Sequence, residues 1–294
     1  MELVYILNET AQAVINTANI NATVGGVAAI SSQQYFTALL NSMNVLLPYM
    51  LLLGFIYLPR IVSLIQKSSV RGLMRQMKEI TGRNVIVMSH VDSGLFGQMI
   101  TLADLNKMEK LIRKHKMKDI DFILNTPGGE VFASMRIAQL IKRYNGRVIV
   151  PKYAMSGGTM VSLGASEIIM DRNACMGPCD PQVGTLFKSF SDRGWNEIIK
   201  RKGYKKSHDD TIAMAMMASQ VTDTIRGSMK KLLNIKNKKQ KARTLDRLTK
   251  GETAHLQQFS IADMKDMGFN VTELNTDIPH KIIELFKEGG VIGI

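Results

Sequence analysis

Two glycine-containing loops carry the groups that could catalyse acyl transfer. The first is Asn-Thr-Pro-Gly-Gly at 125–129, which follows a β-branched run and precedes an amphipathic stretch. Glycines let the backbone expose its N–H groups at a helix amino terminus, where a developing negative charge is stabilised. The loop therefore has the sequence of an oxyanion hole. An ordinary strand-to-helix turn is the alternative.

The second loop, Tyr-Ala-Met-Ser-Gly-Gly-Thr at 153–159, places a serine between a strand and a helix of small residues. A serine at such a turn exposes its hydroxyl above the sheet, with the following N–H positioned to bind an oxyanion. Ala154 stands where the G-x-S-x-G motif has its first glycine, so a hydrolase-type elbow is not the best match. The alternative is that Ser156 caps the following helix.

The composition excludes several classes of protein. The chain has 294 residues and is 45% hydrophobic, which suits one full-sized domain with an appendage and excludes intrinsic disorder. Cys175 and Cys179 are its only cysteines, which excludes a disulfide scaffold and a four-cysteine zinc site. Because no histidine lies in their region, no metal and no cofactor are expected; buried and reactive thiols both fit.

Short β-branched runs alternate with amphipathic stretches from Asn84 onward. Strands are predicted at 85–88, 120–124, 148–150 and 167–170, and helices at 102–115 and 131–144. This βαβ rhythm predicts an α/β fold with a mostly parallel sheet, whose functional sites lie at the loops after the strands. From about Ser189 the pattern becomes helical, with helices predicted at 209–233, 261–268 and 281–287.

The charge is divided unevenly along the chain. The net charge is +13. The only charged residues from Met1 to Pro59 are Glu2 and Glu9, so this part carries −2 and the remaining residues carry +15. Phe36 to Leu58 is an uncharged run of the length that spans a bilayer, which predicts a transmembrane helix. Asn and Pro residues dilute its first half, so an interfacial or re-entrant segment remains an alternative.

Basic residues follow this apolar run and none precedes it. Because Lys and Arg beside a membrane span stay on the cytoplasmic side, the amino terminus is expected outside and the main domain in the cytoplasm. The expected organisation is an extracytoplasmic tail at 1–35, a transmembrane helix at 36–59, a basic juxtamembrane segment at 60–83, a catalytic core at 84–188 and a helical part at 189–294.

The sequence resembles the Clp-protease/crotonase superfamily. The resemblance lies in the two glycine-containing loops at 125–129 and 153–159, followed by Gly-Pro-Cys-Asp-Pro-Gln at 177–182 and Gly184. Within this superfamily these motifs are most similar to the membrane-bound serine dehydrogenase proteinase family, which is related to signal peptide peptidase A. The resemblance implies a ββα-spiral domain, serine peptidase activity and assembly into homo-oligomers. It also implies that Ser156 is the nucleophile and that the N–H groups of Gly129 and Gly157 bind the oxyanion.

The resemblance does not supply the general base directly. Soluble Clp proteases have histidine where this chain has Asp180, whereas relatives of signal peptide peptidase A use a lysine. Gly-Tyr-Lys-Lys at 203–206 precedes a predicted helix, so Lys205 or Lys206 is the expected base, with a solvated lysine pair as the alternative. His255 lies where relatives have a Thr-His segment, and is either catalytic or a surface histidine. Asp180 is expected to shape the cleft wall through a turn, with a catalytic carboxylate as the less favoured role.

A basic stretch near the carboxyl end has two interpretations. Arg226 to Lys250 contains ten basic residues and a single acid, Asp246. Contact with anionic lipid headgroups and a simply solvated helix face fit it equally well. Nucleic acid is not expected as a partner, since no aromatic residue is interleaved with the lysines.

Taken together, the sequence predicts a membrane-anchored serine endopeptidase that cleaves membrane-associated or hydrophobic polypeptides. Polypeptide substrate, a lipid bilayer and further copies of the chain are the expected partners. A catalytically silent membrane scaffold of the same fold is one alternative, and a crotonase-type acyl-CoA enzyme is another.

Overall fold

The computed structural model describes residues 32–90, 98–185, 188–251 and 255–294. The chain forms two units, Met1–Ile65 and Gln66–Ile294. Most of the expected extracytoplasmic tail, residues 1–31, lies outside the described residues.

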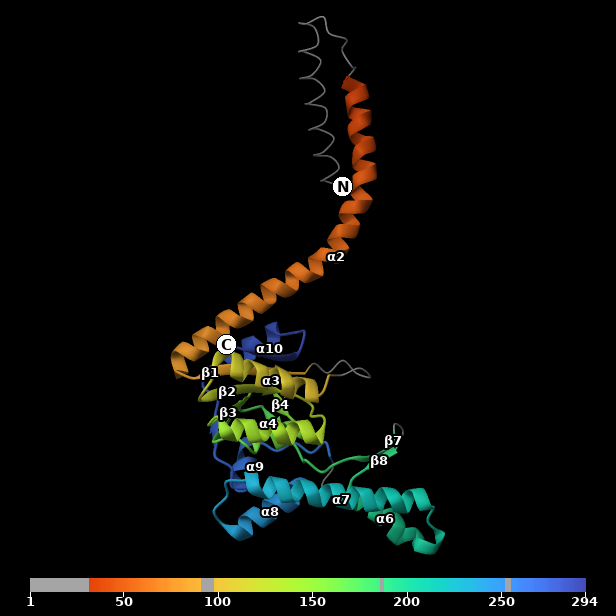
Figure 1. The fold of residues 1–294 in the computed structure, drawn as a ribbon, viewed down its shortest axis with the longest axis vertical. Helices are drawn as coiled ribbons and strands as arrows, with labels where there is room; N and C mark the ends of the chain where they lie inside the picture. Colours follow the sequence, from red (N-terminus) through yellow and green to blue (C-terminus); the bar gives the residue numbers. More distant parts are fainter. Residues whose placement is uncertain (1–31, 91–97, 186–187, 252–254) are drawn as a thin grey trace, which may run out of the picture. The chain divides into compact units, whose positions relative to one another are not determined.

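A six-stranded sheet forms the centre of the second unit (Figure 1). Its strands are β1 (Asn84–Ser89), β2 (Ile120–Asn125), β3 (Arg147–Val150), β5 (Glu167–Met170), β9 (Val271–Glu273) and β10 (Gly290–Gly293). They lie in the order β10-β1-β2-β3-β5-β9, and all neighbours are parallel except β10, which runs antiparallel to β1. The predicted α/β fold with a mostly parallel sheet is confirmed.

The helices and small strands connect and cover this sheet. The helices are α3 (Leu102–His115), α4 (Val131–Arg143), α5 (Gly157–Ser162), α6 (Asp192–Lys202), α7 (Asp209–Leu232), α8 (Lys238–Thr249), α9 (Ile261–Asp266) and α10 (Ile278–Leu285). The small strands are β4 (Tyr153–Ala154), β6 (Cys175–Met176), β7 (Val183–Thr185) and β8 (Lys188–Phe190). Helix α10 begins three residues before the predicted position because Pro279, which suits a first helical turn, lies near its start.

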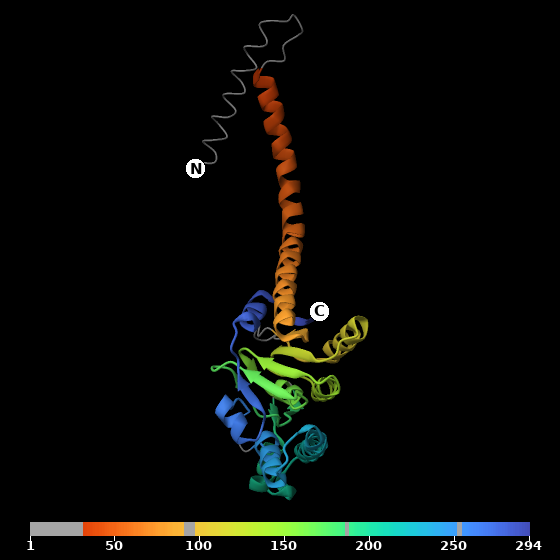
Figure 2. The same cartoon turned by 90° about the vertical axis from the view of Figure 1, so that its left-hand side faces the viewer.

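The two faces of the sheet bury different clusters, because successive side chains along a strand point to opposite faces. Ile86 and Met88 of β1 face a large core that also contains buried residues of α3, α4, α7, α8 and α9. Val85 and Val87 face the other way, against α10 and the last turns of α2 (Ser32–Thr81). Figure 2 shows α10 and α8 on different sides of the sheet.

Helix α2 includes both the predicted transmembrane segment and the predicted basic juxtamembrane segment. Its Leu51–Thr81 portion is long and apolar enough to cross a membrane, and the most apolar window in it is not buried by protein. Large side chains on this portion are exposed, including Phe55 at 83% and Leu51 at 65%. Such exposure of long apolar residues fits a lipid environment better than water.

Candidate active site

The two glycine-containing loops are held side by side by backbone hydrogen bonds. The first follows β2, the second follows β4, and Thr126 pairs with Ala154 as in a parallel ladder. Thr126 N–H donates to the carbonyl of Tyr153 at 3.0 Å, and Met155 N–H donates to the carbonyl of Thr126 at 3.0 Å. The site therefore lies at the carboxyl ends of strands, as the βαβ pattern predicts.

Ser156 occupies the turn between β4 and α5 in an unusual conformation. Its φ is 48° and its ψ is −113°, a combination that residues other than glycine rarely adopt. Its hydroxyl makes no capping hydrogen bond with α5, so the alternative of a helix-capping serine is wrong. Ser156 is half-buried. A strained, partly exposed serine without a capping role is typical of a nucleophile held at a sharp turn.

Close packing of glycines brings two free N–H groups next to Ser156. A Cβ at Gly128 would lie 2.9 Å from Cβ of Ser156 and 3.0 Å from N of Gly157, while a Cβ at Gly157 would lie 3.0 Å from N of Gly129. Within the described part of the chain, the N–H groups of Gly129 and Gly157 donate to no acceptor. Two unpaired donors beside a serine form the arrangement that stabilises a tetrahedral oxyanion.

A network of buried polar groups contacts the first loop, residues 125–129. Nδ1 of His90 lies 2.8 Å from Oγ1 of Thr126, which in turn accepts the N–H of Gly128 at 3.2 Å. On its other side, Nε2 of His90 lies 3.4 Å from Oδ2 of Asp104. Burial acts to raise the pKa of Asp104, but hydrogen bonds from His90 and Thr101 lower it overall. No local pattern in the sequence indicates this network, because His90 and Thr126 are 36 positions apart.

Asp180 and His255, assigned separately from the sequence, form a hydrogen-bonded pair. Nδ1 of His255 lies 2.7 Å from Oδ1 of Asp180, whose carboxylate is only 2% exposed. Nε2 of Gln182 donates to the other carboxylate oxygen, Oδ2, at 2.7 Å. A carboxylate with both oxygens bonded holds the imidazole ring in one orientation.

A single strand pairing explains why these two residues meet. Met176 of β6 pairs antiparallel with Phe259, and each N–H donates to the other carbonyl. Asp180 comes four residues after Met176 and His255 four residues before Phe259, so antiparallel register sets them opposite each other. This equal spacing is visible in the sequence only once the pairing is known.

The same strand β6 links this pair to Ser156. Ala154, two residues before Ser156, pairs with Met176 in parallel. Gly177 N–H donates to Oγ1 of Thr159, and a Cβ at Gly177 would lie 2.5 Å from Cε of Met155 and 3.2 Å from the carbonyl of Gln257. The segments that carry Ser156 and His255 therefore both pack against Gly177.

The structure does not join the two candidate lysines to these groups. Lys205 and Lys206 lie on a single 3₁₀ turn (Tyr204–Lys206) between α6 and α7, and both are exposed. Neither lysine side chain makes a hydrogen bond or ion pair with the rest of the described chain. Burial favours the neutral form of a lysine, and neither of these two side chains is buried in the single chain.

Of the two cysteines, Cys179 is buried and Cys175 is half-buried. Burial, helped by the neighbouring Asp180 carboxylate, strongly raises the pKa of the Cys179 thiol, and burial also raises the pKa of the Cys175 thiol. Both thiols are free. In the described ranges, no group of three or more histidine, cysteine or carboxylate side chains is arranged to hold a metal ion.

Comparison with known protein families decides the class of this site. Residues 34–288 match the model of the ClpP-like SDH-type serine proteinases. The chain belongs to this family. As an SDH-type serine proteinase it is a serine peptidase with a ClpP-like α/β fold, as the sequence predicted.

Two curated relatives come from Methanocaldococcus jannaschii, the uncharacterized proteins MJ0137 and MJ1495. MJ0137 is 34% identical over 229 residues, which cover 74% of this chain and 78% of the relative. MJ1495 is 34% identical over 224 residues, which cover 73% of this chain and 74% of the relative.

Solved structures with a similar fold include two proteases. A serine-to-alanine variant of the 1510-N membrane-bound stomatin-specific protease is 17% identical, with a TM-score of 0.41 over 63% of this SDH-type proteinase and 79% of that chain. ClpP1 from Listeria monocytogenes is 16% identical, with a TM-score of 0.41 over 66% of this chain and 92% of that one.

Proposed function

We propose that the protein is a membrane-anchored serine endopeptidase in which Ser156, His255 and Asp180 form the catalytic triad. The 2.7 Å contact between His255 and the buried Asp180 carboxylate carries this proposal. A histidine oriented by a carboxylate is the usual proton acceptor for a serine nucleophile, and the order of the three residues along a chain varies between folds.

In the proposed reaction, Oγ of Ser156 attacks the carbonyl carbon of the scissile peptide bond while Nε2 of His255 accepts the hydroxyl proton. The N–H groups of Gly129 and Gly157 donate to the oxyanion that forms, and Asp180 stabilises the charged imidazole through Nδ1. The imidazolium then gives its proton to the leaving amine as the C–N bond breaks. Water, deprotonated by the same imidazole, hydrolyses the acyl-enzyme and restores Ser156.

Lys205 and Lys206 are the competing proposal for the base. The resemblance to signal peptide peptidase relatives supports a lysine, whereas the exposure of both side chains argues against it. In a homo-oligomer, which we also propose, burial by a neighbouring copy would change that environment.

The anchor and the substrate complete the proposal. The Leu51–Thr81 part of α2 supports membrane insertion, and the excess of basic residues after residue 59 supports an outside amino terminus with a cytoplasmic peptidase domain. Membrane-associated or hydrophobic polypeptides are the proposed substrates, since an anchored peptidase meets these first.

An active-site-directed fluorophosphonate tests the triad. We expect the full chain in membranes to be labelled, and Ser156→Ala to remove the label. His255→Ala and Asp180→Asn should slow labelling by roughly 100-fold or more, because proton acceptance and orientation of the imidazole are lost. His280→Ala is the matched control, since His280 also contacts a carboxylate, Oδ2 of Asp171 at 3.6 Å.

Each other outcome points to a different conclusion. Loss of labelling in Lys205→Ala or Lys206→Ala, with normal labelling of His255→Ala, would replace the histidine by a lysine. Absence of labelling in the correctly assembled wild type would instead favour a catalytically silent scaffold.

A further inference from the structure

A large excess of positive charge lies around α8. Its one acidic residue, Asp246, is already paired with Arg226 at 2.6 Å and with Lys250 at 2.9 Å. Seven further cations have no carboxylate within 4.0 Å among the described residues, namely Lys230, Lys231, Lys236, Lys238, Lys239, Lys241 and Arg243. Such a concentration of unneutralised charge attracts an anionic partner.

A groove between α7 and α8 collects part of this charge. Its volume is about 750 Å³, and no acidic side chain lines it. Five basic residues line this α7–α8 groove: Arg226, Lys230, Lys236, Lys238 and Lys241. The groove is also lined by Ile235 and Leu245, which are 8% and 5% exposed and give the lining an apolar component.

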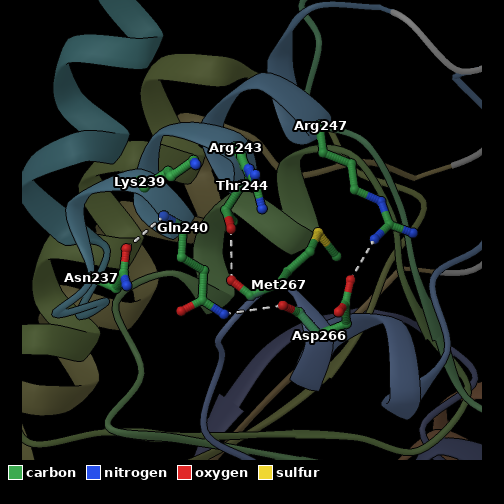
Figure 3. A pocket seen from close by; sticks show the side chains of 8 residues that line it. All are labelled: Asn237, Lys239, Gln240, Arg243, Thr244, Arg247, Asp266 and Met267. Carbon is green, nitrogen blue, oxygen red and sulfur yellow. Dashed lines mark hydrogen bonds and ion pairs between the residues drawn. The ribbon is translucent and has the colours of Figure 1, made fainter.

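In the hollow on the other side of α8, several of the polar groups bind one another (Figure 3). Thr244 donates to the carbonyl of Met267 at 2.6 Å, Gln240 to that of Asp266 at 3.1 Å, and Arg247 pairs with Asp266 at 3.5 Å. These bonds join α8 to α9. Four of the five cations that line the α7–α8 groove, Lys230, Lys236, Lys238 and Lys241, have no carboxylate within 4.0 Å among the described residues, whereas Arg226 is paired with Asp246.

The position and lining of the α7–α8 groove indicate the class of partner. Buried residues of α7 and α8 belong to the cluster on one face of the sheet, whereas Val70 and Met74 of α2 pack on the opposite face. Within the second unit, the groove therefore lies on the opposite face of the sheet from these residues of α2. No aromatic residue lines it, so it lacks a platform for stacking nucleic-acid bases.

We propose that the α7–α8 groove binds an extended polypeptide segment that carries acidic side chains beside apolar ones. The carboxylates would pair with the lysines and the apolar side chains would lie against Ile235 and Leu245. Binding there would hold a substrate or partner on the peptidase domain independently of the catalytic step.

A binding measurement tests this without requiring cleavage. The full chain with Ser156→Ala, in a neutral detergent, is titrated into a fluorescein-labelled twelve-residue peptide of alternating Glu and Leu. We expect saturable binding that weakens as salt is added. Lys236→Glu with Lys238→Glu should weaken it roughly tenfold, since two attractive contacts become repulsive.

Lys200→Glu with Lys202→Glu is the matched control, because these exposed residues of α6 change the net charge equally. Equal loss of affinity in both double variants, or no binding at all, would overturn the proposal. Tighter binding of a twelve-nucleotide RNA, or of vesicles rich in phosphatidylserine, abolished by the same groove variants, would also overturn it. If the glutamate variant unfolds, Lys236→Gln with Lys238→Gln must still weaken binding.

Discussion

At the scale of single residues, the site depends on glycines that keep backbone groups close to Ser156. Gly128 has a φ of 122°, and a Cβ there would lie within 3.0 Å of both the Ser156 side chain and the Gly157 nitrogen. Real Cβ atoms do not approach so closely. Any side chain at this position must therefore separate the nucleophile from the oxyanion donors.

Gly128→Ala should consequently slow fluorophosphonate labelling by roughly 100-fold, the effect of losing an oxyanion donor, and destabilise the fold by about 1–3 kcal/mol. Gly227→Ala is the control, since Gly227 lies inside α7 with nothing within 4 Å. That change should leave labelling unaltered and stability equal or slightly higher. Labelling rates and urea unfolding of both variants measure the effects; normal labelling of Gly128→Ala would show that the glycine is not needed.

A second residue-scale prediction concerns the thiols. Because Cys179 is buried and its pKa is strongly raised, iodoacetamide should leave it unmodified in the native protein and leave fluorophosphonate labelling intact, while the half-buried Cys175, whose pKa is also raised, should react more slowly than an exposed cysteine. In urea, both should react. Mass spectrometry of the tryptic peptides measures the modification, and rapid native alkylation of Cys179 together with loss of activity would contradict its burial.

At the scale of elements, the sequence predicted the regular parts well and the contacts between distant loops poorly. The β-branched run at 120–124 becomes β2, and the amphipathic stretch at 102–115 becomes α3 with the predicted limits. These patterns are local, so periodicity alone reveals them. The Asp180–His255 contact depends on the pairing of Met176 with Phe259, which lie 83 positions apart. No local pattern reports such a pairing.

The start of α3 provides a prediction about pH. Thr101 and Asp104 form a capping box, and His90 contacts the same carboxylate. The folded-state pKa of Asp104 is below its ordinary value of 3.8, so its contribution to stability is complete above about pH 4 and is lost as the pH falls further. Asp104→Asn should therefore cost about 1–2 kcal/mol at pH 7.

The same substitution should cost progressively less as the pH falls below 3.8, because the charge of the wild-type carboxylate, and the stability that it adds, is lost on protonation. Urea unfolding of the wild type and Asp104→Asn at pH 7 and below pH 3.8 measures the difference. Asp223→Asn, on the exposed side of α7, is the control and should be nearly neutral at both. An equal cost of Asp104→Asn at both pH values would show that its charge does not stabilise α3.

At the scale of the whole molecule, the net charge of +13 combines two parts with different environments. The first 59 residues contain no basic side chain, and the exposed apolar residues of α2 lie largely before residue 66. The peptidase unit, which begins at Gln66, holds nearly all the positive charge. This division supports the proposed topology, in which the basic domain stays in the cytoplasm and the uncharged segment crosses the bilayer.

Alkaline carbonate should accordingly fail to extract the full chain from membranes, because α2 is held by apolar contacts that high pH does not break.

In sealed vesicles with the outer surface of the cell facing outward, added proteinase K should remove only the amino-terminal tail, a loss of about 4 kDa for the roughly 35 residues expected outside. Epitope tags at each end, detected on blots, report the result. With detergent present, both tags should disappear. Digestion of the carboxyl-terminal tag in intact vesicles would reverse the orientation, and release by carbonate would remove the anchor altogether. In that case the exposed apolar side chains of α2 would have to be covered by protein, and the natural candidate would be another copy of the same helix.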